Sequence, residues 1–335
     1  MKRRHALTLL SLGVATWVTG CGGGSSDSST TTDGSSVTGS GTTDATLVNG
    51  PTDLVMLAQS DPNLSILVEA VIAADMVATL KGSGPFTVFA PVNAAFAALL
   101  GELGLTKAQL LADKALLNQV LTYHVLAGKV ERAQIPGGKA ITTVQGGIFK
   151  IDTAGGTATI TDGRNRTAGI LVADRQASNG VMHTIDRVLL PANKTLLQTA
   201  QALPQFSILV EAVMAANLQD ALSATGPLTV FAPTNDAFTQ LLAQINFTKE
   251  ALLSSGPLLA DMLKYHVVPG RVLKADVPVD SPITTLEGSS FTIASDLTIT
   301  DQLLRSSRIT ATDVLASNGV IHVVDQVLLH RVILA

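Results

Sequence analysis

The chain has 335 residues and a formal net charge of −4, with 22 Lys and Arg against 26 Asp and Glu. No basic stripe stands out, which argues against nucleic acid as a partner. Hydrophobic residues make up 46% of the sequence and charged residues 14%, so the chain can bury a packed core and is not disordered throughout.

The first 20 residues have the pattern of a secretory signal. A basic start precedes an uncharged, mostly apolar run from residue 6 to residue 18, which is too short to span a membrane. The ending Val18-Thr19-Gly20-Cys21 resembles a bacterial lipobox, which implies that Cys21 is lipidated and becomes the first residue of the mature protein. The alternative is an ordinary signal peptide that happens to end near a Cys. Cys21 is the only cysteine, so it cannot form an internal disulfide.

Residues 21–49 consist mostly of Gly, Ser, Thr and Asp and offer little to bury. This composition is typical of a flexible tether, and about 25 such residues have an r.m.s. reach of about 25–30 Å. A lipid on Cys21 followed by this spacer predicts that the folded part stands off a membrane. We expect it in the cell envelope, on the outer membrane or the cell surface.

The remainder is a tandem repeat. Ser65–Phe96 aligns with Ser207–Phe238, with 20 of 32 positions identical. Ala177–Leu190 aligns with Ala316–Leu329, with 10 of 14 identical. The period near 140 residues is far longer than that of a solenoid, so each copy is a whole domain. The predicted domains span 50–191 and 194–332.

Helices are expected first in each copy. In copy one, Asp61-Pro62 resembles an N-cap followed by Pro at the first helical position, and apolar residues at 3–4 spacing predict one helix over 63–80. The alternating stretch 85–91 is rich in β-forming residues and predicts a strand.

Polar residues mark the start of the helices that follow. Asn93 is expected to cap a helix over 94–103, and in copy two either Thr234 or Asn235 takes that place. Apolar residues at helical spacing then continue up to the pair Tyr123-His124.

Strands fill the second half of each copy. Three short alternating runs lie between residues 140 and 163, and two more flank Asn179-Gly180. Asn-Gly between apolar runs is a strong hairpin signal, in which both residues take a positive φ. Asn318-Gly319 repeats the signal in copy two. Helices followed by an antiparallel sheet predict the α+β class.

Each copy places one of only six histidines on the strand after this hairpin. Side chains alternate along a strand, so His183 shares a face with Val181 and Ile185. A His between aliphatic residues is more often buried and hydrogen-bonded than a ligand. Asp186 lies on the opposite face, so the two cannot form a catalytic dyad. We therefore predict structural roles for His183, His322, Asn179, Gly180, Asn318 and Gly319.

Three segments, in the same order in both copies, resemble the fasciclin (FAS1) domain over about 50–332. They are GPFTVFAPVNAAF or GPLTVFAPTNDAF, then Tyr-His, then ASNGVMHTIDRVLL or ASNGVIHVVDQVLL. The resemblance implies that each copy is a wedge-shaped antiparallel β-sandwich with a helical layer, in adhesive surface or extracellular proteins. It also implies a binding region at Tyr123, His124, Tyr265 and His266. The alternative is that these pairs only pack within the fold.

Enzyme motifs are absent from the sequence: it contains no G-x-S-x-G, no H-E-x-x-H, no P-loop and no G-x-G-x-x-G. We predict no catalytic residue, no metal site and no cofactor. The expected function is a membrane-anchored, surface-displayed adhesion module that binds protein or polysaccharide on a matrix or on other cells. A periplasmic module that binds a small ligand or signals is the alternative, and a hydrolase has the weakest support.

Overall fold

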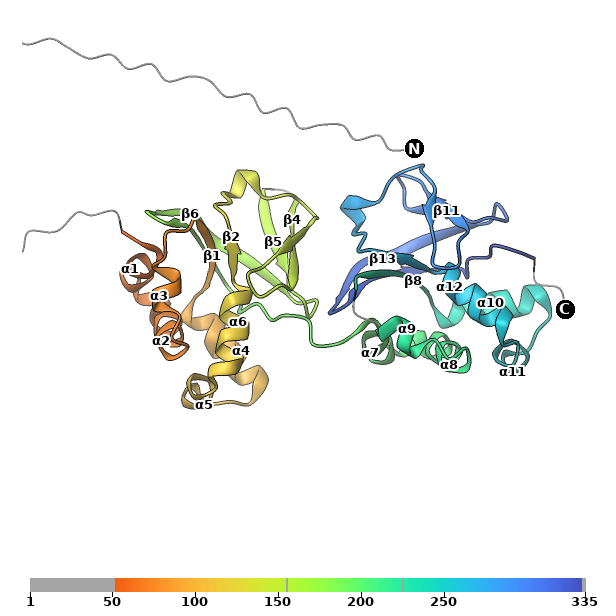
Figure 1. The fold of residues 1–335 in the computed structure, drawn as a ribbon, viewed down its shortest axis with the longest axis horizontal. Coiled ribbons are helices and arrows are strands. Elements are labelled where there is room, and N and C mark those ends of the chain that lie inside the picture. Colours follow the sequence, from red (N-terminus) through yellow and green to blue (C-terminus); the bar gives the residue numbers. More distant parts are fainter. Residues whose placement is uncertain (1–51, 155, 224–225, 333–335) are drawn as a thin grey trace, which may run out of the picture. The chain divides into compact units, whose positions relative to one another are not determined.

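The computed structural model describes residues 52–154, 156–223 and 226–332. Two copies of one architecture follow each other along the chain (Figure 1), and each is described by itself. The predicted signal, the tether and Cys21 lie outside the described residues. Within the described ranges, no helix is long and apolar enough to cross a membrane.

Copy one begins with helices and ends with strands. Its helices are α1 (Leu54–Gln59), η1 (Pro62–Leu64), α2 (Ser65–Ala73), α3 (Val77–Leu80), α4 (Asn93–Leu103), α5 (Lys107–Ala112), α6 (Lys114–Tyr123) and η2 (Arg132–Gln134). Its strands are β1 (Phe86–Pro91), β2 (Val125–Ala127), β3 (Ala140–Thr142), β4 (Ile148–Ala154), β5 (Thr157–Thr161), β6 (Thr167–Ala177) and β7 (Gly180–Ile185).

Copy two repeats this order. Its helices are α7 (Leu196–Gln201), η3 (Pro204–Phe206), α8 (Ser207–Ala215), α9 (Gln219–Ser223), α10 (Asn235–Ile245), α11 (Lys249–Leu253), α12 (Pro257–Tyr265) and η4 (Lys274–Asp276). Its strands are β8 (Leu228–Pro233), β9 (Val267–Pro269), β10 (Ile283–Thr284), β11 (Ser290–Ile293), β12 (Thr298–Thr300), β13 (Ser306–Ala316) and β14 (Gly319–Val324).

Each copy contains one seven-stranded mixed sheet. The strand order is β2-β1-β7-β6-β5-β4-β3 in copy one and β10-β11-β12-β13-β14-β8-β9 in copy two. The α+β class predicted from the sequence is confirmed. Contrary to expectation, the sheet is not wholly antiparallel. One pairing in each copy is parallel, that of β1 with β7 and that of β8 with β14. Both members of each parallel pair are buried almost throughout, as parallel strands usually are.

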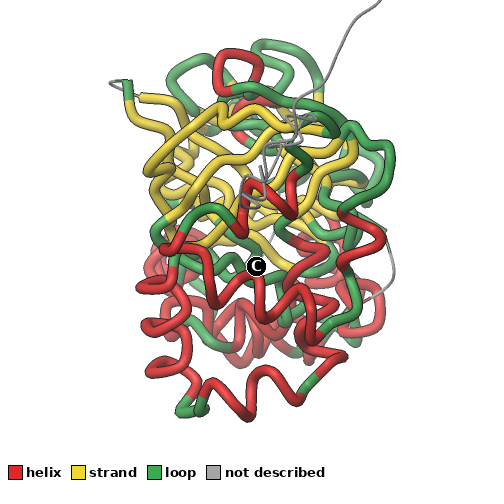
Figure 2. Tube along the Cα trace, turned by 90° about the vertical axis from the view of Figure 1, so that its left-hand side faces the viewer, coloured by secondary structure: helices red, strands yellow, loops and turns green. Residues whose placement is uncertain are grey.

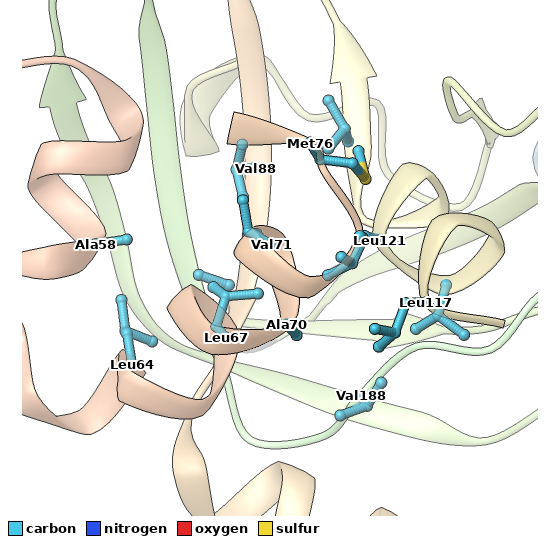
Figure 3. Close-up of a cluster of buried hydrophobic side chains, with 14 of the residues drawn as sticks. Ala58, Leu64, Leu67, Ala70, Val71, Met76, Val88, Leu117, Leu121 and Val188 are labelled. Carbon is cyan, nitrogen blue, oxygen red and sulfur yellow. The ribbon is translucent and has the colours of Figure 1, made fainter. Parts of the chain in front are cut away.

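Strand β6 connects the two parts of the sheet in copy one. The first residues of β6 pair with β5, and the rest pair with β7 across two register shifts. Within each copy the α-helices lie on one side of the strands (Figure 1), and Figure 2, in which the copies overlap, shows most helical residues, in red, apart from the strands, in yellow. One core lies between helices and sheet, where Leu67 and Val71 of α2 pack with Leu117 and Leu121 of α6 (Figure 3).

A second core joins the two parts of the sheet, because the side chains of β1 alternate. Val88 points into the core under the helices, and Phe89 belongs to the second core. The Phe89 ring meets the Phe149 ring of β4 edge to face, with centroids 5.2 Å apart. Phe231 and Phe291 repeat this contact in copy two at 5.0 Å. The central strands are therefore covered on both faces.

The helix expected over 63–80 is interrupted. It consists of η1, α2 and α3, and the chain turns between α2 and α3 at Asp75, whose φ is 57°. Asn217, with a φ of 53°, makes the same turn in copy two. Asp and Asn tolerate this left-handed conformation better than most residues, so the apolar periodicity continues across a break in the backbone.

The capping prediction is wrong for Asn93. The N-cap position is Val92, which forms no side-chain cap bond, while the Asn93 side chain accepts from Ile66 N–H at 3.0 Å and donates to Pro62 O. In copy two, Thr234 is the cap and accepts from Ala237 N–H at 3.3 Å. Asn93 therefore fastens the start of α2 instead of α4.

The Asn-Gly hairpin exists, but its geometry differs from the prediction. The two loop residues are Ser178 and Asn179, and neither Asn179 nor Gly180 has a positive φ. Gly180 is required for another reason: a Cβ there would lie 2.1 Å from Phe86 O of the parallel strand β1. The Gly permits a close approach of two backbones.

Candidate functional site

The Tyr-His pairs end α6 and α12 and point into the fold. Tyr123 is fully buried; its hydroxyl donates to Ile148 O and accepts from Gly163 N–H at 2.8 Å. Burial raises the pKa of Tyr123 well above its usual value. Tyr265 has the same pattern, donating to Ser290 O at 3.0 Å, and burial raises its pKa to about 12. Both hydroxyls therefore stay protonated and join the helix to strand and loop backbone.

The adjacent histidines bridge the same helices to the segment after the last strand. His124 Nδ1 lies 2.7 Å from Val120 O, and its Nε2 accepts from Leu189 N–H at 2.9 Å. An acceptor at Nε2 places the ring proton on Nδ1. His266 makes the matching bond to Leu328 N–H at 2.9 Å. Burial lowers the pKa of both imidazoles to about 4, so both are neutral at pH 7.

None of the four side chains of the Tyr-His pairs is more than 2% exposed. A partner that docks on the fold as it stands therefore cannot touch them. The predicted binding role at Tyr123, His124, Tyr265 and His266 stays untested, and their burial and internal hydrogen bonds favour the alternative that they pack.

His183 and His322 are completely buried on β7 and β14. His183 Nδ1 accepts from Asp174 N–H at 3.2 Å, and Nε2 donates to Val130 O at 3.0 Å. His322 bonds Asp313 N–H at 3.4 Å and Val272 O at 2.8 Å. Both ring nitrogens are thus occupied within the fold, and this geometry supports the structural role proposed for the two histidines.

The Asn side chains of both hairpins also form hydrogen bonds within the fold. Asn179 accepts from Leu54 N–H at 3.0 Å and donates to Leu80 O at 2.8 Å. It therefore ties the hairpin to both α1 and α3. Asn318 accepts from Leu196 N–H at 2.9 Å in copy two. These contacts support the structural role that we propose for both Asn-Gly pairs.

Sequence reasoning missed a buried carboxylate in each copy. Asp162 is 1% exposed; it pairs with Arg166 at 2.8 Å and accepts from Leu190 N–H at 3.0 Å. Asp301 accepts from Leu329 N–H in the same way. The signal was the Asp followed four residues later by Arg in both copies. Because these acids are held by backbone amides and an arginine, they serve the fold.

An apolar cavity lies between α1, α2 and β1, and its counterpart lies in copy two. The cavity of copy one, of about 30 Å³, is lined by residues such as Leu54, Val71 and Met182. The cavity of copy two has about 40 Å³. Such volumes hold one or two water molecules, too little for a metabolite or an acyl chain. The described residues also contain no group of three or more His, Cys, Asp or Glu that could hold a metal ion.

Comparison with known proteins places both copies in one family. The model of the Fasciclin domain matches residues 62–191 and 204–330. The domain boundaries at 50–191 and 194–332 stay predictions. Transforming growth factor-beta-induced protein ig-h3 of Sus scrofa is 31% identical over 255 residues, which cover 75% of this chain and 35% of that protein. The chain therefore spans about a third of the length of this mammalian relative.

Bacterial relatives match a single copy. Protein sll1483 of Synechocystis is 45% identical over 139 residues, covering 40% of this chain and 73% of that protein. Cell surface glycolipoprotein MPB83 of Mycobacterium bovis is 34% identical over 139 residues, covering 40% of this chain and 58% of that protein.

Proposed function

The chain belongs to the fasciclin domain family, and from this premise we propose that it is a lipid-anchored adhesion module displayed at the cell surface. The observation that carries the proposal is the presence of two fasciclin domains after a tether-like segment, residues 21–49. One relative of a single copy is named as a cell surface glycolipoprotein. The expected partners are proteins or polysaccharides of a matrix or of other cells.

The internal chemistry of the domains supports binding over catalysis. The buried groups that could exchange protons include His124, His183, Tyr123 and their counterparts in copy two, and each of these six is hydrogen-bonded inside the fold. A general acid or base must reach a substrate in a cavity of adequate size. The apolar cavity beside His124 is far too small for that.

Anchoring through Cys21 is tested by Cys21→Ser. Stable anchoring needs two membrane signals, and a lipidated N-terminal Cys with several acyl chains exceeds that threshold. We expect the variant in the soluble fraction after cell lysis and the natural chain in the membrane fraction. Ser25→Ala, in the same segment, is the matched control and should stay with the membranes. A Cys21→Ser variant that sediments with membranes after a salt wash would overturn the anchor.

Display at the surface is tested by protease treatment of intact cells. Loss of the protein from intact cells is expected, with a periplasmic protein as the internal control. Protection from the protease would favour the second candidate, a periplasmic module that binds a small ligand or signals.

Two domains on one tether favour adhesion through valency. Once one domain is bound, the second meets its partner at an effective concentration of about mM, which can raise avidity by about 10²–10⁴-fold. The cores of the copies match while their surfaces differ, as in DMVATLKGS against NLQDALSAT. The test is to express residues 48–192 and 193–335 separately, check folding by circular dichroism, and compare their binding to cells or matrix with that of the tandem. Equal binding by one half would refute the valency argument.

A further inference from the structure

Arg271 is a cation for which the described residues provide no hydrogen bond or ion pair. It follows β9, and its Nε is buried and has no hydrogen-bond partner among the described residues. No ion pair involves its guanidinium in the described ranges. Burial alone lowers the pKa of Arg271, and no nearby charge contributes to the shift. Arginine keeps its charge in proteins, so the fold carries a partly desolvated positive charge that no described residue neutralises.

In copy one, the cation at the matching position is paired with an acid. Lys129 takes the place of Arg271, 142 residues earlier, and pairs with Glu131 at 3.0 Å. In copy two, the position of Glu131 is held by Leu273, which is fully buried. Copy two therefore has an Arg where copy one has a Lys, and a buried Leu where copy one has the acid. An unpaired guanidinium costs stability unless a ligand supplies the anion.

Arg271 borders open space of adequate size. Arg271 lines a cavity of about 440 Å³ together with Thr195, Ser223, Pro227 and Ser317. The side chains of Ser223 and Ser317 are on exposed residues and can turn toward a ligand. The cavity is within the usual range for small-ligand sites.

We propose that Arg271 is the anchor of an anion-binding site in copy two, and that its ligand is a carboxylate-bearing sugar, a uronate unit of an acidic polysaccharide. A guanidinium binds a carboxylate through two parallel hydrogen bonds. The hydroxyls of Thr195, Ser223 and Ser317 match the hydroxyls of a sugar ring, and Pro227 offers a flat apolar surface to its C–H groups. The inference rests on the proposed adhesive function and names the chemistry of its partner.

A protein partner fits this cavity less well. Protein interfaces concentrate their affinity in buried aromatic and apolar anchors. The described lining of the cavity contains no aromatic residue, and it includes three hydroxyl side chains beside the charged Arg271. The chain as a whole is acidic, at −4, so an acidic polymer would be attracted to this local charge and not to the molecule in general.

The test is calorimetric titration of the full tandem chain with tetragalacturonate, its neutral methyl ester and a tetraglutamate peptide. We expect tetragalacturonate to bind most tightly, and more weakly as salt is raised. Arg271→Gln should reduce this affinity by about 10-fold or more, as removal of charged hydrogen bonds commonly does. Arg271→Lys should restore part of it. Lys129→Gln, at the matching position of copy one, should leave it unchanged.

A second readout separates binding from folding. Because none of the described residues bonds to the guanidinium of Arg271, Arg271→Gln should melt no lower than the natural chain when no ligand is present. Equal binding of the methyl ester, undiminished affinity in Arg271→Gln, or absence of binding by all three probes at mM concentration would overturn the site. Tighter binding of tetraglutamate would overturn the sugar in favour of an acidic protein. An adhesion assay on cells that carry Arg271→Gln separates failure of this site from failure of the proposed function. If adhesion persists in these cells, the proposed function stands without the site.

Discussion

Acidification from pH 7 to pH 5 is expected to destabilise both copies through His124 and His266. Burial lowers the pKa of each imidazole from 6.5 to about 4. Between these values the unfolded chain binds more protons than the folded chain, so the free energy of unfolding falls as the pH falls. The stability is fully present above pH 6.5 and is lost progressively toward pH 4.

The size of the loss follows from the two pKa values. One pKa unit corresponds to about 1.4 kcal/mol. At pH 5, which is about 1.5 units below the pKa of the unfolded imidazole, that imidazole is protonated while the folded one is still neutral. Each copy should therefore lose about 2 kcal/mol. Burial also lowers the pKa of His322, which adds to the loss in copy two. Carboxyls with a lowered pKa, such as Glu287, also stabilise the fold, but this stabilisation is lost only at more acidic pH.

Urea denaturation followed by circular dichroism at pH 7, 6 and 5 measures this effect. His124→Asn keeps a donor and an acceptor but does not titrate, so it should remove the loss in copy one. The double variant His124→Asn/His266→Asn should show a much flatter profile, at a lower overall stability. An unchanged pH dependence in the double variant, or a flat profile in the natural chain, would show that these buried histidines do not govern acid stability.

Three further substitutions test the packing of copy one, each by equilibrium denaturation against the natural chain. His183→Ala leaves two partly buried backbone groups without a partner and should cost ~1–3 kcal/mol, while Arg187→Ala, exposed on the same segment, should cost less than ~0.5 kcal/mol; equal effects would refute the structural role. Gly180→Ala forces a Cβ against the neighbouring strand and should cost about 3 kcal/mol; a neutral result would contradict the close approach. Val92→Thr imports the cap that Thr234 provides in copy two and should add about 0.5–1 kcal/mol, and a loss of stability would contradict the cap assignment.

The sequence predicts those parts of the fold that depend on local chemistry. The cap at Asp61 and the Pro after it are found as expected, because a side-chain oxygen near a free N–H acts over a few residues. The strand at Phe86–Pro91 and the strands around Asn179 are likewise found, since alternation and turn residues are short-range signals. The order of helices before strands was enough to predict the α+β class.

What the sequence did not predict depends on contacts between distant segments. The parallel pairing of β1 with β7 joins strands about 90 residues apart, and no local pattern distinguishes it from an antiparallel pairing. The role of Asn93 depends on Ile66 N–H, which lies 27 residues away in the sequence. The same holds for Gly180, whose neighbour is Phe86 O. Hairpin and capping rules predict local roles for these residues, but in the structure their roles are set by contacts with distant segments.

The two copies act as an internal comparison of fold and function. Hydrogen bonds at Tyr123, His124 and His183 recur in copy two with the same backbone partners in the fold, which is what a structural requirement produces. The Lys129–Glu131 pair does not recur, and the position of its cation in copy two is Arg271, which forms no ion pair with the described residues. Residues shared by both copies therefore point to the architecture, whereas an unbalanced charge present in one copy points to a ligand. In this chain, binding residues are therefore expected at the positions where the copies differ.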